Sequence, residues 1–571
     1  MNERDILGID FGTTNSKMAY MLLDEPVIIE NREGTIVTPS VVDFRSVDDA
    51  VVGEQAKRSI IVHPDRVVSS IKRQMGTDYR KRVGRYKLPP EYIGSLIFKK
   101  LVDDAEFRLG KRYYDAVVSV PANYSDGQRQ AIKDAADIAG VNVLRLINEP
   151  TAAALAYGVR EDSDRRLLVY DFGGGTFDVS VLTVDSGFFD VDASTGEHQL
   201  GGDDMDARIV DHVAKTMHRE LGIDPRKDLA LHATVREAAE AAKIALSTAE
   251  STTVSIPFVA PGKPPFTMDL SRTTLESLVR DIIERTKEPI EQALDDAALA
   301  RDEIDDILLV GGTTLIPAVR KFVIEYFDKV PLAGDPYQAV ALGAAIAGTE
   351  FGREKSRAAR NIRISDVISQ SLGVRVADGT LSKVIERNTK VPISRKRHYT
   401  NAGDFSDRVI IPVHQGDEEM AKDNEFLGDF WISIEPMLQG GNRIDVTFEV
   451  GKEFGILNVT AFDHDSGNRR TVKLESRSRL SKKDKDKWMK KMHGVESAHV
   501  LFANEAKSVT FDLYLAPWGT VSDLMRDLRE KGVLGEDEGI EYNGAVLDPV
   551  QRLGGLGLTE ESVISARKGD E

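Results

Sequence analysis

The sequence predicts a multidomain protein, with a duplicated α/β domain, an all-β unit and a small α+β domain in that order. From Ile6 to about Gly348, short apolar runs alternate with amphipathic stretches, which is typical of α/β layers. Beyond residue 366 the hydrophobic period changes to two, as in Val446 and Phe448, which predicts strands. The length of 571 residues suggests about three or four domains.

The composition excludes several classes of protein. Lys and Arg number 75 against 93 Asp and Glu, a net charge of −18, whereas a chain that coats nucleic acid or anionic membrane needs a basic surface. The absence of cysteine excludes disulfides, thiol catalysis and thiolate-bound zinc. No run of about 18 apolar residues occurs, and no signal-like stretch opens the chain. We therefore expect a cytoplasmic protein with neither nucleic acid nor membrane as a partner.

Changes in composition predict the domain boundaries. We expect an α/β domain over 1–352, a linker over 353–365, an all-β unit over 366–480, a charged spacer or remnant helix over 481–499 and the α+β domain over 500–571. The segment 476–493 carries eight Lys or Arg against two Asp. We interpret it as a solvated helix or spacer, because Trp488, Met489 and Met492 offer only a small apolar strip.

Two segments share one layout: ILGIDFGTTNSKMAYML (6–22) and LLVYDFGGGTFDVSVL (167–182). Each has a strand, an Asp, a Phe-Gly, small or hydroxyl residues and a second strand, which suggests a duplicated fold with a cleft between its halves. The alternative is two ordinary Gly-rich hairpins.

Glycine backbones and hydroxyls suit a polyphosphate, and facing carboxylates could hold magnesium and orient an attacking water. The candidates are Asp10, Gly12, Thr13, Thr14 and Asn15, and Asp171, Gly173, Gly174, Gly175 and Thr176. No GxxxxGK[ST] sequence occurs, which excludes a P-loop enzyme.

Three further segments fit the same site. Glu240, Lys243, Ile244 and Ser247 share one helical face, which suits a ribose and a purine; the alternative is a solvated face with an ion pair. DDILLVGGTTLIPAV predicts a buried strand, a Gly-Gly turn and a capped helix, a geometry in which a nucleoside can approach the backbone. RLINEPTAAALAYG places Glu149 between a strand and an Ala-rich helix.

Together these motifs resemble the heat shock protein 70 (DnaK) chaperone family. GIDFGTTNS, SVPANYSDGQRQAIKDAADIAG, INEPTAAALAYG, YDFGGGTFDVSV, LGGDD and VGGTT…P occur in the family's order over about 1–350. SDVISQSLGV, IERNTKVP, HQGDEEMAKDN and GILNVTAFDHDSGN resemble its peptide-binding domain and extend the resemblance to about 480. The resemblance implies an actin-like (ribonuclease H-like, duplicated) ATPase domain that controls a peptide-binding β-sandwich. It also implies ATP or ADP, Mg²⁺ and K⁺ as cofactors, and unfolded polypeptides, a J-domain co-chaperone and a nucleotide-exchange factor as partners.

Site residues follow from the resemblance where the motifs match. Asp10 and Asp171 would sit near magnesium through water, and the catalytic set would be Lys72, Glu149, Asp171 and Thr176. The nucleotide would contact Gly12, Thr13, Thr14, Asn15, Gly173, Gly174, Gly175, Gly202, Glu240, Lys243, Ile244, Ser247, Gly311, Gly312, Leu315 and Asp335. Pro121 and Arg129 would relay the nucleotide state, and Arg145, Asn148 and Asp366 would meet the J-domain. Val374, Val376, Val409 and Ile411 would line the peptide pocket, with Ala402 at the arch over it.

The sequence departs from the family's pattern in four places. Leu315 replaces the usual arginine, so the purine would lie between Leu315 and Ile244. The segment 76–112 is shorter than usual, and the linker carries Arg363 where family members have leucines. The family's long helical lid is absent after Lys482.

In place of the lid, residues 511–569 resemble a ubiquitin-like β-grasp domain, and the alternative is a small α/β capping domain. The chain ends in Asp570-Glu571, so we do not expect conjugation through a free Gly-Gly tail. We predict an ATP-dependent chaperone with a C-terminal module that recruits an unknown partner. The alternative is a nucleotide-gated scaffold for a dedicated partner, with slow or incidental hydrolysis.

Overall fold

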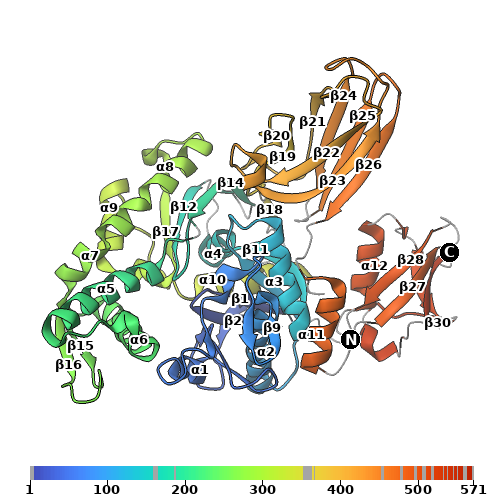
Figure 1. Cartoon of the computed structure of the whole chain (residues 1–571). Coiled ribbons are helices and arrows are strands. Elements are labelled where there is room, and N and C mark those ends of the chain that lie inside the picture. The colour runs from blue at the N-terminus through green and yellow to red at the C-terminus, as the bar shows by residue number, and fades with distance from the viewer. Residues whose placement is uncertain are drawn as a thin grey trace.

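Two sheets of similar arrangement form the two lobes of the N-terminal domain (Figure 1). The strand order is β11-β10-β1-β2-β3 in lobe I and β17-β12-β13-β14-β18 in lobe II. In each lobe the aspartate-bearing strand begins an antiparallel meander and has a parallel strand on its other side. The strands are β1 (Ile6–Asp10), β2 (Asn15–Leu22), β3 (Glu25–Ile29), β10 (Asp115–Val120), β11 (Asn142–Asn148), β12 (Arg165–Phe172), β13 (Phe177–Asp185), β14 (Phe188–Glu197), β17 (Asp306–Val310) and β18 (Arg363–Ser365). The repeated hairpin layout thus correctly predicts a duplicated fold.

This computed structural model describes residues 6–568, apart from 159–164, 186–187, 198, 352–362, 366, 452–455, 476–479, 494–497, 505–508, 516–519, 531–532, 536–537, 544, 550, 557 and 559–561. The helices of the two lobes are α1 (Glu54–Ser59), α2 (Pro90–Leu109), α3 (Asp126–Ala139), α4 (Glu149–Gly158), α5 (Gly202–Leu221), α6 (Leu229–Leu246), α7 (Arg272–Arg285), α8 (Lys287–Asp296), α9 (Pro317–Phe327) and α10 (Ala339–Gly348). Shorter elements are β4 (Thr38–Pro39), β5 (Val42–Phe44), β6 (Ala50–Val52), β7 (Val67–Val68), η1 (Ile71–Gln74), β8 (Lys81–Val83), β9 (Tyr86–Leu88), η2 (Pro225–Lys227), β15 (Ser251–Ile256), β16 (Phe266–Ser271), η3 (Arg301–Glu303), η4 (Gly312–Leu315) and η5 (Thr349–Phe351).

Local sequence explains where the central helices lie. Ser125 and Gln128 form a reciprocal capping box that begins α3, and Gly140 ends it in the left-handed conformation. The Ala-rich helices α4 and α10 cross closely at Gly343. A Cβ there would lie only 1.7 Å from the Ala152 carbonyl oxygen, so a larger residue would force the helices apart. These small residues let the two lobes share one tightly packed centre.

The second unit is a β-sandwich, shown at the top right of Figure 1. Its sheets have the orders β20-β19-β22-β23 and β21-β24-β25-β26. Ile444, Val446 and Phe448 alternate inward and are buried, as the period of two predicts. The elements are β19 (Leu372–Arg375), β20 (Leu381–Ile385), β21 (Ile393–Tyr399), β22 (Arg408–Gln415), η6 (Ala421–Asp423), β23 (Glu425–Ser433), β24 (Ile444–Val450), β25 (Ile456–Asp463) and β26 (Arg469–Glu475).

The sandwich is docked on both lobes. The end of the predicted linker forms β18, which pairs in parallel with β14, and Ile364 packs against the core between the lobes. Asn388 donates to Asp296 of lobe II at 2.7 Å, and Gln415 accepts from the Asp126 amide of lobe I at 3.1 Å. The linker therefore holds the sandwich on the ATPase side through strand pairing, despite its arginine.

The segment predicted as a solvated helix or spacer does form a helix, but the expectation that it is solvated is wrong. Residues of this segment form α11 (Lys482–His493), whose Trp488 and Met489 are 3% and 1% exposed and belong to the core of lobe I. Ser481 caps the helix by accepting from the Asp484 amide at 3.1 Å. The helix packs because Lys485, Trp488, Met489 and Met492 follow an i, i+3, i+4, i+7 spacing, so one face is buried while Lys483, Lys487 and Lys490 are exposed.

The last unit has a five-stranded sheet with the order β28-β27-β31-β29-β30 and one helix, α12, that packs on it. Its elements are β27 (Ala498–Asn504), β28 (Val509–Leu515), α12 (Val521–Glu530), β29 (Glu538–Tyr542), β30 (Ala545–Val546), η8 (Leu553–Leu556) and β31 (Val563–Lys568). Thr520 caps α12 by accepting from the Asp523 amide at 3.1 Å. Strand β27 begins close to the predicted domain start at 500. It lies before residues 511–569, which carry the resemblance to a β-grasp domain, so the sheet has one strand more on that side than the resemblance predicts.

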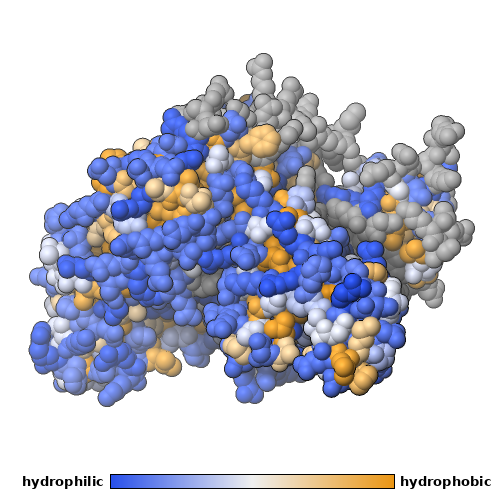
Figure 2. All heavy atoms as spheres, turned by 90° about the horizontal axis from the view of Figure 1, so that it is seen from above, coloured by the Kyte–Doolittle hydropathy of each residue, from blue (hydrophilic) through white to orange (hydrophobic). Residues whose placement is uncertain are grey.

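The surface seen in Figure 2 is mostly hydrophilic, and apolar side chains gather there only in small groups. None of the described helices combines the length and the apolar character that a membrane crossing requires.

Candidate functional site

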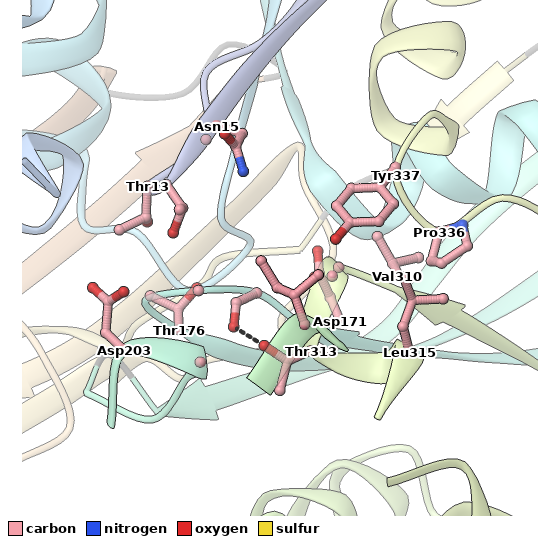
Figure 3. Close-up of a pocket in the computed structure, with 18 of the residues that line it drawn as sticks. Thr13, Asn15, Asp171, Thr176, Asp203, Val310, Thr313, Leu315, Pro336 and Tyr337 are labelled. Carbon is pink, nitrogen blue, oxygen red and sulfur yellow. Dashed lines mark hydrogen bonds between the residues drawn. The ribbon is translucent and has the colours of Figure 1, made fainter. Parts of the chain in front are cut away.

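A cavity of about 500 Å³ lies between the two lobes. Every residue that the sequence predicts for the nucleotide, the metal or catalysis lines it, except Gly175 and Asp335. Figure 3 shows Thr13, Thr176 and Asp203 at one end, and Val310, Leu315, Pro336 and Tyr337 at the other. The cavity thus has a polar end and a largely apolar end, which suits the phosphates and the base of a nucleotide.

The two Gly-rich hairpins meet at the polar end. A Cβ on Gly174 would lie 2.0 Å from Thr14 Oγ1, so only glycine allows this approach. Thr14 Oγ1 is buried, and no described residue hydrogen-bonds to it. Thr313 donates to the Gly173 carbonyl at 2.8 Å and holds the second hairpin against η4. An unpartnered hydroxyl beside glycine backbones fits a phosphate oxygen.

Buried charges lie beneath these hairpins. Lys72, from η1, forms an ion pair with Glu149, the first residue of α4, and both side chains are almost fully buried. Lys17 donates to Asp10 at 3.0 Å. Burial alone would lower the pKa of the Lys72 ammonium, but the Glu149 carboxylate raises it above its ordinary value. Lys72 therefore stays protonated and can face a phosphate oxygen.

The neighbouring carboxylates outnumber these cations. Burial raises the pKa of Asp171 well above its usual range, and repulsion from Glu149 and Asp178 adds to the effect. Burial, with the Glu149 charge, also raises the pKa of Asp178 to about 7. Asp10 and Asp171 end up equally buried, each 7% exposed, on equivalent strands of the two lobes. Such a carboxylate set fits a hard divalent cation, which would lower these pKa values.

The apolar end is partly open. Ile244 and Leu315 line the cavity with 56% and 43% of their surface exposed, as expected if a base is to lie between them. Lys243 is fixed by Asp206 at 2.8 Å and by the Gly202 carbonyl at 3.0 Å. Glu240 pairs across the cleft with Lys57 of lobe I at 2.9 Å.

Two residues that the sequence predicts to contact the nucleotide are not among those that line the cavity, and their contacts stay predictions. The Asp335 carboxylate accepts from the Tyr337 amide at 2.8 Å, and its neighbours Pro336 and Tyr337 line the cavity. The Gly175 carbonyl, in the second hairpin, accepts from Arg73 at 3.0 Å. Sequence reasoning also missed other lining residues, namely Lys17, Asp203, Asp206 and Tyr337. Lys17 could have been found, because it faces Asp10 across the first hairpin.

The predicted coupling residues form a network below the site. Arg129 donates to the Ala122 carbonyl, next to Pro121, at 3.0 Å and to Asn148 at 2.8 Å. The Tyr124 carbonyl accepts from Arg129 at 3.2 Å and from Ser369 of the sandwich at 3.0 Å.

The Tyr124 hydroxyl donates to the Lys72 carbonyl at 3.0 Å, so one residue touches both the charged site and the sandwich. Arg145 lies apart from this network in an exposed pair with Glu350 at 2.8 Å. Asp366 lies outside the described residues.

The predicted peptide-pocket residues divide into two groups. Val374 and Ile411 are buried and Val409 is half-buried, and all three belong to the sandwich core. Val376 is half-buried beyond the end of β19, and Ala402 is exposed in the connection between β21 and β22. The structure therefore brings three of the five together.

The fold and the cleft define a class: a nucleotide-binding domain of two similar lobes on which a β-sandwich is docked. Comparison with known proteins gives the family. The model of the Hsp70 protein family matches residues 6–87 and 81–510. The chaperone protein DnaK of Thermotoga neapolitana is 44% identical over 487 residues, which cover 84% of this chain and 82% of that protein. DnaK of Thermosipho africanus is 43% identical over 489 residues, covering 84% and 82%.

The chain therefore belongs to the Hsp70 family. It is an Hsp70 chaperone and an ATPase that binds ATP or ADP with Mg²⁺. Asp10 and Asp171, with the hydroxyls at the polar end of the cavity, fit that cation and nucleotide. The expected potassium ion stays a prediction.

The raised pKa of Asp178 predicts a pH-dependent stability. Between pH 4 and its folded pKa of about 7, the folded state holds a proton that the unfolded chain has released, so stability falls as pH rises. We expect the free energy of unfolding of the nucleotide-free protein, measured in urea, to fall between pH 5.5 and 7.5. The fall should be about 2 kcal/mol larger in wild type than in the Asp178→Asn variant. The exposed Asp65→Asn variant is the control and should behave as wild type. An equal pH slope in wild type and Asp178→Asn would contradict this assignment.

Proposed function

We propose that this protein couples ATP binding and hydrolysis to the binding and release of extended apolar peptide segments. The contact that carries the proposal is Tyr124, which bonds to Lys72 on one side and to Ser369 of the sandwich on the other. A shift of Lys72 toward or away from a phosphate would move Tyr124, and with it the hydrogen bond to Ser369 of the sandwich. Unfolded polypeptides are then the clients, and a J-domain co-chaperone and a nucleotide-exchange factor are the expected partners.

Residues at the polar end have distinct proposed roles in hydrolysis. Mg²⁺, when bound, would neutralise phosphate charge and orient water. Lys72 would hold a γ-phosphate oxygen, and its pair with Glu149 fixes its position. Glu149 and Asp171 would accept hydrogen bonds from the attacking water. Thr176, which lines the same end, would donate its hydroxyl to the phosphate.

We further propose that the peptide pocket works without a helical lid. The described helix that follows the sandwich, α11, packs on lobe I and leaves the sandwich uncovered by it. The strand order and single helix of the last unit support the ubiquitin-like assignment, and its open sheet face supports a role in binding a protein.

The second candidate, a nucleotide-gated scaffold, is favoured by the contacts of the last unit with lobe I. Arg552 pairs with Asp115 at 3.1 Å, and Asn142 donates to Asp523 at 3.0 Å. Stimulation of single-turnover hydrolysis by many unrelated apolar peptides supports the chaperone, whereas a response to one partner alone supports the scaffold.

Catalysis is tested at Lys72 and Thr176. Lys72→Ala and Thr176→Ala should each slow single-turnover hydrolysis by about a hundredfold or more, because each removes a contact that strengthens in the transition state. Nucleotide affinity should stay close to wild type, since the glycines of both hairpins and the apolar end are untouched. Lys321→Ala, at an exposed site on α9, is the control. Wild-type rates in either variant would remove that residue from the catalytic set.

The uncovered pocket predicts fast peptide release even with ADP bound. Only strand pairing and the apolar pocket would hold the peptide, because no helical lid covers it. Differences in affinity usually appear in the off-rate. Stopped-flow measurement with a labelled peptide should give release within seconds or less. Release that takes many minutes in ADP would show that another element covers the pocket.

A further inference from the structure

A second cavity, of about 490 Å³, lies between the two lobes next to the nucleotide cavity. Its lobe I wall comes from the segment between Val68 and Tyr79, which contains η1, and its lobe II wall comes from α5, α6 and Arg226. Asp203 lines both cavities, and Figure 3 shows it beside Thr176 at the polar end of the first. The second cavity therefore begins where the terminal phosphate of a bound nucleotide would lie.

A single turn of chain separates the two cavities. Lys72 lines the nucleotide cavity, whereas its neighbour Arg73 lines the second one. Arg73 reaches across to lobe II, where it donates to the Gly175 carbonyl at 3.0 Å. Ser70 crosses beside it and donates to Asp203 at 2.9 Å. Both contacts join lobe I to lobe II, so they break when the lobes move apart.

Several hydrogen-bond donors that line the second cavity are available to a ligand. The Arg236 guanidinium makes no hydrogen bond to a described residue, and its one ion pair among them, with Asp203, is 3.9 Å long. The Ser69 and Tyr79 hydroxyls and the His232 ring also have no hydrogen-bond partner among the residues that the structure describes. These four side chains come from both lobes and surround one space.

The carboxylates of the same cavity already have donors. Asp204 accepts from the Gly201 amide at 2.8 Å, and Asp211 pairs with Arg226 at 3.1 Å. Asp203 accepts the cross-lobe hydroxyl hydrogen bond. Because the acceptors are satisfied while the donors are not, the second cavity suits an anion.

A third cavity, of about 280 Å³, adjoins the other two but suits an anion less well. Arg236 lines it too, together with the lobe II carboxylates of Asp206, Glu237 and Glu240. One buried oxygen of Glu237 has no hydrogen-bond partner among the described residues. An anion in the third cavity would be repelled by that carboxylate, so the charges favour the second cavity.

We infer that the second cavity is a binding site for inorganic phosphate, which receives the product of ATP hydrolysis while ADP still fills the first cavity. With ADP in place, the ribose and the base block the apolar end, so phosphate cannot leave in that direction. At the polar end it meets the Ser70 and Arg73 contacts, and once these open, the unpaired donors hold it. The inference rests on the ATPase activity and not on the proposed coupling to peptide.

Binding is tested with the nucleotide cavity filled. A non-hydrolysable ATP analogue with Mg²⁺ occupies the γ-phosphate position, so added phosphate can bind only elsewhere. Equilibrium dialysis with labelled inorganic phosphate should show saturable binding that chloride at the same ionic strength does not abolish. Arg236→Gln should weaken this binding about tenfold, because one charge-assisted contact is lost. Arg208→Gln, on α5 outside the cavity, is the matched control, since its side chain is 49% exposed against 48% for Arg236.

The passage is tested by filling the second cavity. Ala207 is exposed on α5 and lines it, so Ala207→Phe should block it, whereas Ala230→Phe puts the same side chain on α6 outside all three cavities. In a single turnover, acid quench gives the total phosphate and a fluorescent phosphate-binding protein gives the free phosphate. We expect free phosphate to trail total phosphate in Ala207→Phe alone.

Three results would overturn the inference. They are the absence of saturable phosphate binding beside the ATP analogue, an equal affinity in Arg236→Gln and Arg208→Gln, and simultaneous appearance of total and free phosphate in Ala207→Phe.

Discussion

The buried charge cluster under the cleft is the constraint on which the rest of the structure depends. Glu149, Asp171 and Asp178 lie in a space that water barely reaches, and unpaired carboxylates there cost several kcal/mol each. Protonation offsets that cost, as the raised pKa values of Asp171 and Asp178 indicate, and so do cations from more than one element: Lys72 comes from η1, and Mg²⁺ would come with the nucleotide. A cleft between two similar lobes brings carboxylates from both sides to one point, which explains why the duplicated fold and the site occur together.

That cluster is also the point at which the site meets the sandwich. Tyr124 bonds to the Lys72 backbone and to Ser369, so no long chain of intermediates is needed between phosphate and peptide domain. Coupling in this protein is therefore expected to work through a sandwich that is docked on both lobes, with the linker strand β18 as a further attachment.

Much of this could be predicted from the sequence, for identifiable reasons. The hairpins at Asp10 and Asp171 carry local patterns, whereas Lys72 has none and was found only through resemblance. Asp178 was missed because its burial and repulsion arise from tertiary packing. Helix α11 was mistaken for a solvated segment because its many lysines hide the i, i+3, i+4, i+7 spacing of Lys485, Trp488, Met489 and Met492. The α3 carboxylates that pair with Lys485 are brought to it only by tertiary packing.

The central claim, that the state of the charge cluster reaches the sandwich through Tyr124, is most directly tested by the Ser369→Ala variant. Ser406→Ala, whose hydroxyl bonds within its own sandwich loop, is the matched control. The measurement is the ratio of single-turnover ATP hydrolysis with and without an apolar peptide. We predict an unchanged basal rate and a severalfold smaller peptide effect in Ser369→Ala alone. A full peptide effect in that variant would contradict the account.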